Sequence, residues 1–234
     1  MHYVIGDIHN ELQKLRSILN QINLTPSDEL IVLGDAFDRG GFDADPVGVY
    51  FALSEIRGKC TWIRGNHDQW LADYIKEYYS KSERRRKKMH PYTYNSFELM
   101  TQRLTEVDML NLADLIYSLP LQKELEVGGK KYLLAHAMTS PVGVPQKQDY
   151  YLMGTYDLDA FFLEGIDGFI SMCGHTPTGN VLWCQNNMYL DECKESIWRN
   201  EKENVFLMDC GCGFESGRLA CMCIETGERF YSIE

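Results

Sequence analysis

The sequence has no run of apolar residues that approaches the roughly 20 needed to span a bilayer. A strand predicted from His2 also leaves no room for a signal peptide before it. We therefore expect a cytoplasmic protein with no membrane contact. Internal repeats and low-complexity linkers are missing as well, and a chain of 234 residues can bury a sizeable core. The prediction is a single domain over residues 1–234.

Positive charge is scarce in this chain. Lys and Arg total 23 against 34 Asp and Glu, which gives a formal net charge of -11. So acidic a balance argues against a nucleic-acid partner held by general electrostatics. Any anion that binds must therefore meet positive charge concentrated locally, supplied by metal ions or by a few arginines.

Eight cysteines are present, yet nothing predicts export, so we expect them to be reduced and either packed or metal-binding. Four of them form two Cys-x-Cys pairs, Cys210 with Cys212 and Cys221 with Cys223, which we place on adjacent strands of a hairpin. A four-cysteine zinc site is one interpretation. Core packing is the favoured one, because small cysteines fill sheet cores readily and a flat hairpin does not wrap a tetrahedral ion.

The first third of the chain alternates predicted strands and helices. Strands are expected at residues 3–5, 30–33 and 60–63, and helices over 12–22, from Pro46 and from about Gln69. Asn10 and Gln13 form a variant of a capping box for the first helix. This βαβαβ order indicates a largely parallel sheet.

Residues 74–120 change character: the basic run "KSERRRKKMH" is followed by a helical pattern through Leu110, Leu112, Leu115 and Ile116. A helical cap insertion is predicted over about residues 74–110. Beyond it, apolar runs such as "KKYLLAHA", "GFISMCGH", "NVLWC", "NVFLMDCG" and "RLACMCI" predict strands, and turn signals lie near residues 128–129, 216–217 and 226–227. The strand-rich second half predicts a second sheet. The expected fold class is therefore α/β, with two facing mixed sheets flanked by helices.

Polar clusters follow the first three predicted strands: "GDIHN", "GDAFDRG" and "RGNHD". Open α/β sheets place their sites beyond the carboxyl ends of the strands, so these clusters should converge. Two later strands end in His136 and His175, so four of the six histidines lie at strand ends. The side chains expected to meet are Asp7, His9, Asp35, Asp38, Arg39, Asn66, His67, Asp68, His136 and His175.

Taken singly, each of these residues has an ordinary structural interpretation. A lone Asp at a strand end commonly caps a turn or a helix, and His136 alone is typical of a hydrogen-bonded core histidine. Their coincidence argues otherwise, because so many carboxylates and imidazoles at one edge need a cation between them. The mixture of Asp, Asn and His suits Mn²⁺, Fe²⁺, Zn²⁺ or Mg²⁺. Two ions about 3.5 to 4 Å apart, sharing one carboxylate, would suit in-line displacement at phosphorus.

The three clusters, the "LLAHA" histidine and the "CGHTPT" histidine, in that order, resemble the phosphoprotein phosphatase branch of the calcineurin-like metallophosphoesterases. That branch includes bacterial and lambda-phage serine/threonine phosphatases. The resemblance spans almost the whole chain, with the cap its least similar part. It implies a four-layer αββα sandwich with two divalent metal ions, Mn²⁺ first among the candidates.

The resemblance also implies roles for individual residues. Asp7 and His9 would hold the first metal, Asp35 would bridge both, and Asn66, His136 and His175 would hold the second. A hydroxide between the ions would attack phosphorus in line, while Arg39 and Asn66 bind the phosphoryl oxygens. His67 would protonate the leaving oxygen, oriented by Asp38. An alkoxide is a poor leaving group unless protonated, and an imidazole backed by a carboxylate is a suitable donor.

The chain departs from the family pattern in two places that bear on substrate, and one of them is Asp68, which stands where the protein phosphatases more often have glutamate. The family normally has a second phosphate-binding arginine between the last two histidines, and none lies between His136 and His175. Lys147, Tyr150 and Tyr151 are possible substitutes, as are Arg84, Arg85 and Arg86 of the cap. The basic run over residues 81–88 is interpreted either as a solvated helix face or as a rim that attracts acidic or phosphorylated substrates.

Three functions are carried forward. The favoured one is a phosphatase for phosphomonoesters, above all phosphoserine and phosphothreonine in proteins. The second is a hydrolase of diadenosine tetraphosphate. The resemblance favours it at Asp68, because some such hydrolases end the third motif in aspartate, and disfavours it at Asp38, because their second motif lacks this aspartate. The third is a scaffold without turnover that binds phosphorylated partners. A phosphorylated protein or a small phosphoester is thus the expected partner; the sequence specifies neither the physiological substrate nor an oligomeric state.

Overall fold

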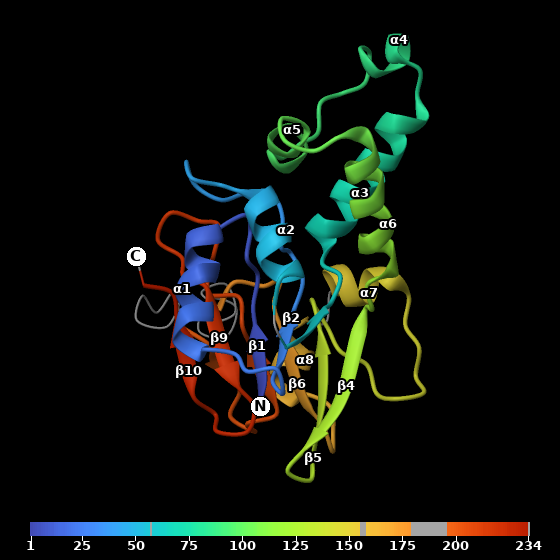
Figure 1. The fold of residues 1–234 in the computed structure, drawn as a ribbon. Coiled ribbons are helices and arrows are strands. Elements are labelled where there is room, and N and C mark those ends of the chain that lie inside the picture. Colours follow the sequence, from blue (N-terminus) through green and yellow to red (C-terminus); the bar gives the residue numbers. More distant parts are fainter. Residues whose placement is uncertain (57, 155–157, 179–195, 234) are drawn as a thin grey trace.

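The computed structural model describes residues 1–56, 58–154, 158–178 and 196–233 (Figure 1). Two five-stranded sheets organise them. The first has the strand order β10-β9-β1-β2-β3 and the second β4-β5-β6-β8-β7. The strands of the first sheet are β1 (His2–Ile5), β2 (Glu29–Val32), β3 (Lys59–Trp62), β9 (Ala220–Cys223) and β10 (Arg229–Tyr231). Those of the second are β4 (Gln122–Val127), β5 (Lys130–Ala135), β6 (Ile170–Cys173), β7 (Trp198–Arg199) and β8 (Val205–Leu207).

The side chains of an inner strand alternate between two hydrophobic cores, one on each face of the sheet. On β1, Val4 packs in the core between the sheets and Ile5 in the core under the helices, because successive residues of a strand point to opposite faces. Leu134 of β5 and Met172 of β6 meet Val4 from the second sheet. The two sheets therefore face each other across an apolar layer.

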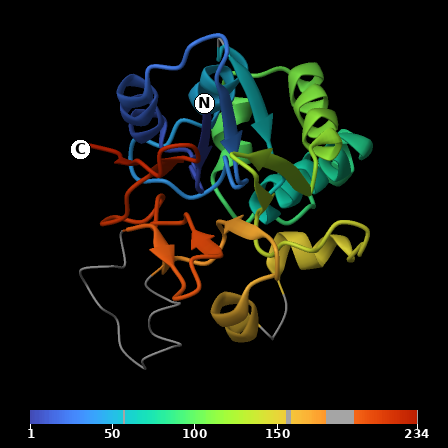
Figure 2. The same cartoon turned by 90° about the horizontal axis from the view of Figure 1, so that it is seen from below.

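Helices cover the outer faces of both sheets. The first sheet packs against α1 (Leu12–Ile22), α2 (Pro46–Ser54), α3 (Asn66–Ser80) and α6 (Glu106–Ser118), while α8 (Leu158–Glu164) packs on β6 and β8 through Phe161 and Phe162. Figure 2 shows α8 and α7 (Gln148–Met153) on the side away from α1. This four-layer arrangement confirms the predicted fold class.

The cap rises beyond the sheets as an extension of α3 (Figure 1). It contains the one-turn helix α4 (Glu83–Arg86), α5 (Ser96–Thr101) and the upper part of α6. Helix α6 ends at Ser118, in agreement with the helical pattern predicted through Ile116. That residues 1–234 form a single domain stays a prediction.

The three strands predicted in the first third of the chain lie within one residue of their expected positions, but one helix start and one helix cap differ. Helix α3 begins at Asn66 rather than near Gln69, because the Asp68 carboxylate accepts the Gly65 N–H at 2.9 Å and closes the first turn early. The capping box of Asn10 and Gln13 is wrong. The cap residue of α1 is Glu11, and the Asn10 amide instead donates to Ser96 Oγ at 3.0 Å.

The hairpin predicted near residues 216–217 is also wrong. Strand β8 pairs with β6 and β7, whereas β9 pairs with β1 and β10, so the chain crosses from one sheet to the other between them. The two Cys-x-Cys pairs therefore do not sit on one hairpin, and Cys210 and Cys212 pack in different cores. The groups of side chains close enough to hold a metal, as far as the described residues go, contain no cysteine. Core packing is thus the interpretation that the structure supports.

The predicted strand "NVLWC" falls on residues 180–184, outside the described residues. Within the described residues, every helix is too short or too polar to pass through a bilayer.

Candidate active site

The predicted site residues converge where the two sheets meet at the carboxyl ends of their parallel strands. Strands β1, β2 and β3 run parallel to one another, as do β5, β6 and β8, and the loops that follow them carry the polar clusters. The structure brings together Asp7, His9, Asp35, Asp38, Arg39, Asn66, His67, His136 and His175, and all but Arg39 and His175 are fully buried. Burial of so many polar groups at one point requires that they satisfy one another or a bound ion.

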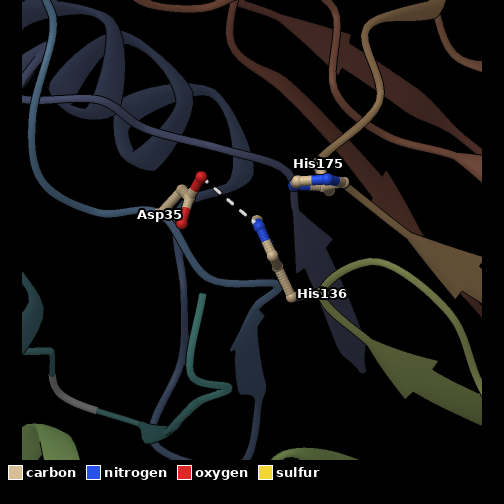
Figure 3. A group of neighbouring side chains, drawn as sticks. All are labelled: Asp35, His136 and His175. Atoms are coloured by element: carbon tan, nitrogen blue, oxygen red, sulfur yellow. Dashed lines mark ion pairs between the residues drawn. The ribbon is translucent and has the colours of Figure 1, made fainter. Parts of the chain in front are cut away.

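One candidate ligand group joins Asp35, His136 and His175 (Figure 3). His136 Nε2 lies 3.3 Å from Asp35 Oδ2 and 2.8 Å from Asn66 Oδ1. His175 Nδ1 lies 2.9 Å from the same Asn66 oxygen. Four side chains from loops after β2, β3, β5 and β6 therefore point at one small volume.

A second group joins Asp7, His9 and Asp35, with His9 Nε2 3.9 Å from both Asp7 Oδ2 and Asp35 Oδ2. In each group the ligand atoms lie within 4.8 Å of one another. Asp35 is common to both groups. The donor set of carboxylate, imidazole and amide oxygen fits a pair of borderline to hard divalent ions that share one carboxylate.

Hydrogen bonds to backbone groups around the cluster orient the candidate ligand side chains. His9 Nδ1 donates to Phe37 O at 3.0 Å and His136 Nδ1 donates to Leu33 O at 2.8 Å, because a carbonyl can only accept. Each ring therefore presents its Nε2 to the cluster, as metal-binding histidines typically do. The carboxylates are held in the same way: the His175 N–H donates to Asp7 Oδ1 at 3.1 Å and the His67 N–H to Asp35 Oδ1 at 2.9 Å.

Two glycines are required because the backbone passes very close to these carboxylates. A Cβ at Gly65 would lie 2.1 Å from Asp35 Oδ1, and one at Gly174 would lie 2.1 Å from Asp7 Oδ1. The loops are also tightly wound, since Asp35 and His175 have φ values of 47° and 64° in the left-handed region. Such backbone is uncommon outside glycine and clusters at functional sites.

The cluster perturbs its own titration. Burial raises the pKa of Asp7, with the nearby Asp209 adding to the effect. Burial alone would lower the pKa of His136, but the charge of Asp35 and the hydrogen bond to it raise this pKa to about 10. Burial lowers the pKa of His9 to about 4, and burial together with His136 lowers that of His175 to about 3. Two imidazoles are thus kept neutral, the form that binds a metal.

A separate pair lies beside the ligand groups. His67 Nδ1 is 3.1 Å from Asp38 Oδ2, and both residues are buried. The His67 ring stands edge-on to the His9 ring, with centroids 5.1 Å apart. The imidazole predicted to act as a proton donor is therefore adjacent to the ligand group of Asp7, His9 and Asp35, and it is backed by a carboxylate.

Asp68 does not reach the ligand groups. It accepts from the Ala36 N–H at 3.0 Å and the Gly65 N–H at 2.9 Å, and the Trp62 indole donates to it at 3.3 Å. Burial, followed by the charge of Asp35, raises the pKa of Asp68 to about 7. Asp68 thus ties two site loops together.

Arg39 lies over the Phe214 ring, 4.9 Å from its centroid, and its Nη1 is 3.4 Å from His9 Nε2. Of the suggested substitutes for a second arginine, Tyr150 is already engaged, since its hydroxyl donates to Thr139 O at 2.9 Å. Arg86 is engaged in the cap, where its guanidinium donates to Tyr78 O and Tyr79 O. Both are therefore unsuited to a phosphate-binding role.

Sequence reasoning missed several residues at the site. Asp209 follows β8, is buried, and acts electrostatically on Asp7. Its position at the end of a strand, in "NVFLMDCG", is the signal that could have found it. Tyr92 and Ser96 of the cap contact Asp38, and nothing in the local sequence marks them.

The sequence profile of the calcineurin-like phosphoesterase family matches residues 3–206, most of the chain. The chain is a calcineurin-like phosphoesterase. The phosphoesterase is 27% identical to an uncharacterized protein of Methanocaldococcus jannaschii over 203 residues, 83% of this chain and 72% of that protein. Its fold is similar to that of a putative diadenosine tetraphosphatase, with a TM-score of 0.64 and 16% identity over 98% of this chain and 91% of the other. It is also similar to a protein serine/threonine phosphatase from Saccharomyces cerevisiae, with a TM-score of 0.58 and 14% identity over 100% of this chain and 80% of the other.

Family membership makes this phosphoesterase a metal-dependent phosphoester hydrolase, and its candidate ligand groups agree with that. The predicted family and fold are confirmed. The roles of individual residues stay predictions, and so do the identity of the metal and the substrate.

Proposed function

We propose that this phosphoesterase is a dimetal-dependent phosphatase acting on phosphomonoesters, above all phosphoserine and phosphothreonine in proteins. The observation that carries the proposal is the buried His67–Asp38 pair, 3.1 Å apart, beside the ligand groups. An alkoxide leaving group has a high pKa and needs a proton as the ester bond breaks, whereas a nucleotide phosphate leaves without one. An intact acid pair therefore favours alkyl phosphomonoesters.

The residues proposed to hold two divalent ions, Mn²⁺ first among the candidates, with Fe²⁺, Zn²⁺ and Mg²⁺ as the others, are Asp7, His9, Asp35, Asn66, His136 and His175. When bound, such ions lower the pKa of water enough to supply hydroxide near neutral pH. No side-chain base is then required.

The remaining steps fall to the side chains around the ligand groups. The planar guanidinium of Arg39 would bind two phosphoryl oxygens, and the side-chain amide of Asn66 would bind a phosphoryl oxygen as well. His67 holds a proton on Nε2 and gives it to the leaving oxygen, while Asp38 keeps the ring oriented through Nδ1.

A second candidate, hydrolysis of diadenosine tetraphosphate, is favoured by exposed aromatic rings at the site. Trp70 packs 4.9 Å from the His67 ring and is 38% exposed, and Phe214, under Arg39, is 50% exposed. Such faces can stack on a purine. The absence of a second arginine between His136 and His175 also weakens the case for a tightly held phosphoprotein.

The third candidate, a scaffold that binds phosphorylated partners, depends on the basic run of the cap. Arg84, Arg85, Lys87 and Lys88 are exposed at its tip. We propose that they attract acidic substrates. Charge reversal at Arg84 and Arg85 that left the dissociation constant of a phosphopeptide unchanged would remove this role.

The test compares two substrates on one preparation. Protein stripped of metal and reloaded with Mn²⁺ is assayed for phosphate release from a phosphothreonine peptide and from diadenosine tetraphosphate in parallel. We expect higher kcat/KM on the peptide, and a fall of about 10²- to 10⁴-fold in His67→Ala on alkyl esters with metal binding retained. A preference for the dinucleotide would transfer the proposal to the second candidate, and release from neither substrate with any of the four metals would favour the scaffold.

A further inference from the structure

The cap touches the acid pair through one short segment, residues 92–96, which follows α4 and enters the first turn of α5. The Tyr92 hydroxyl donates to Asp38 Oδ2 at 2.6 Å. The Asp38 N–H donates to Ser96 Oγ at 2.7 Å, and the Asn95 amide donates to Arg39 O at 2.7 Å. Three cap residues thus fasten the loop that carries Asp38 and Arg39.

The hydrogen bonds of the Asp38 carboxylate are unevenly distributed. Oδ2 accepts from both His67 Nδ1 and the Tyr92 hydroxyl, and the Tyr92 bond is the shorter of the two. Oδ1 is buried and has no hydrogen-bond partner among the residues that the structure describes. A buried carboxylate that keeps one oxygen unpaired depends strongly on the partners of the other. Without Tyr92, His67 alone would hold it.

The Tyr92 hydroxyl is fixed in place and stays a donor. Its ring packs on Tyr74 with centroids 5.1 Å apart and on Tyr94 with centroids 5.9 Å apart. Tyr94 in turn packs edge-on against His67, with centroids 4.5 Å apart. Burial, followed by the charge of Asp38, raises the pKa of Tyr92, so its phenol keeps its proton at neutral pH.

We propose that Tyr92 is a positioning residue for the Asp38–His67 proton donor, supplied by the cap rather than by the two sheets. This inference rests on the proposed function. By bonding to Oδ2, Tyr92 fixes the carboxylate plane and stabilises its charge, which keeps His67 Nδ1 bonded and Nε2 directed at the leaving oxygen. The cap is then part of the machinery for alkyl leaving groups, and a substrate with an activated leaving group does not need it.

The experiment measures leaving-group dependence in Tyr92→Phe, which keeps the ring contacts and removes the hydroxyl. On an alkyl phosphate ester we expect kcat to fall about tenfold with KM unchanged, since a hydrogen bond to a charged group is lost. On 4-nitrophenyl phosphate, whose leaving group needs no proton, we expect a change within about twofold.

Tyr74→Phe is the matched control. Its hydroxyl also donates within the cap, to His90 O at 3.1 Å, and its ring touches Tyr92, but that bond does not reach Asp38. Loosening of the cap alone would affect both variants equally and both substrates equally. Coupling is tested in the Asp38→Asn background, where Tyr92→Phe should cause no further loss if it acts through Asp38.

The outcomes separate the two proposals. A wild-type protein that turns over both esters, with Tyr92→Phe indistinguishable from Tyr74→Phe, overturns the positioning role and leaves the proposed function standing. A wild-type protein that releases no phosphate from either ester rejects both. Independently of turnover, ¹³C labelling of tyrosine should give a Tyr92 Cζ resonance that moves in Asp38→Asn. A resonance that does not move overturns the contact itself.

Discussion

Asp35 belongs to both candidate ligand groups, so its replacement should abolish both metal sites at once. One group contains Asp7 and His9 and the other contains His136 and His175, while Asp35 is the member they share. His9→Ala and His175→Ala should therefore each remove one site and leave the other. Asp35→Asn should remove both, because a neutral amide cannot bridge two cations as a carboxylate does.

The size of the effect follows from linkage between binding and folding. At a free metal concentration 100 times the dissociation constant, each occupied site stabilises the folded chain by about 2.7 kcal/mol. For a domain of this length that corresponds to a rise of about 5 to 10 °C in Tm per site. Wild type should gain two such steps, His9→Ala and His175→Ala one each, and Asp35→Asn none.

The assay combines Mn²⁺ bound per chain, measured by equilibrium dialysis, with Tm measured by calorimetry before and after metal is added. Comparing each variant with its own metal-free form removes the direct effect of the substitution on stability. His2→Ala is the control, because His2 pairs with Glu225 at 2.7 Å and lies outside both ligand groups. Two ions bound to Asp35→Asn with wild-type affinity would refute the shared-carboxylate reasoning.

Three further predictions concern packing around the site. Phe37→Ala should lower the free energy of unfolding in guanidinium by about 3 to 5 kcal/mol, because the ring is fully buried against Trp62; a loss below about 1 kcal/mol would contradict this. Gly174→Ala should weaken Mn²⁺ binding at least about tenfold, since its Cβ would collide with Asp7, whereas Gly41→Ala, with no neighbour closer than 3.9 Å, should bind as wild type does. Arg86→Ala should lower Tm, because Arg86 lies over the Tyr78 ring and donates to three backbone carbonyls. Substitution of the exposed neighbour, Arg84→Ala, should leave Tm unchanged. Equal Tm values for the two variants would show that Arg86 does not stabilise the cap.

Local patterns determined most of the first sheet and the list of metal-binding candidates. The strands before Asp7, Asp35 and Asn66 are short apolar runs that end in glycine-containing polar clusters, and that signal lies within about ten residues of sequence. Parallel strands bring such ends to one edge whatever the rest of the chain does. The sequence therefore predicted which side chains would meet before any contact between them was known.

The sequence did not predict where a side chain points or which strand pairs with which when the partners lie far apart along the chain. Asn10 has the composition of a helix cap, yet its side chain turns to Ser96, 86 positions along the chain. Strands β8 and β9 look like a hairpin, yet they belong to different sheets. Leu207 of β8 packs with Phe161 of α8, whereas Cys221 of β9 packs in the core between the first sheet and its covering helices. Local sequence sets the propensity for an element, whereas tertiary packing decides what the element meets.

The acid pair shows this division within a single residue. The sequence by itself determined that Asp38 follows the second strand and that His67 follows the third, and the family resemblance linked them. Only the tertiary structure placed Tyr92, 54 positions from Asp38, against the same carboxylate oxygen that His67 uses. A hydroxyl near a buried charge has no periodicity or spacing to reveal it, because the contact exists only once the cap has packed onto the sheets.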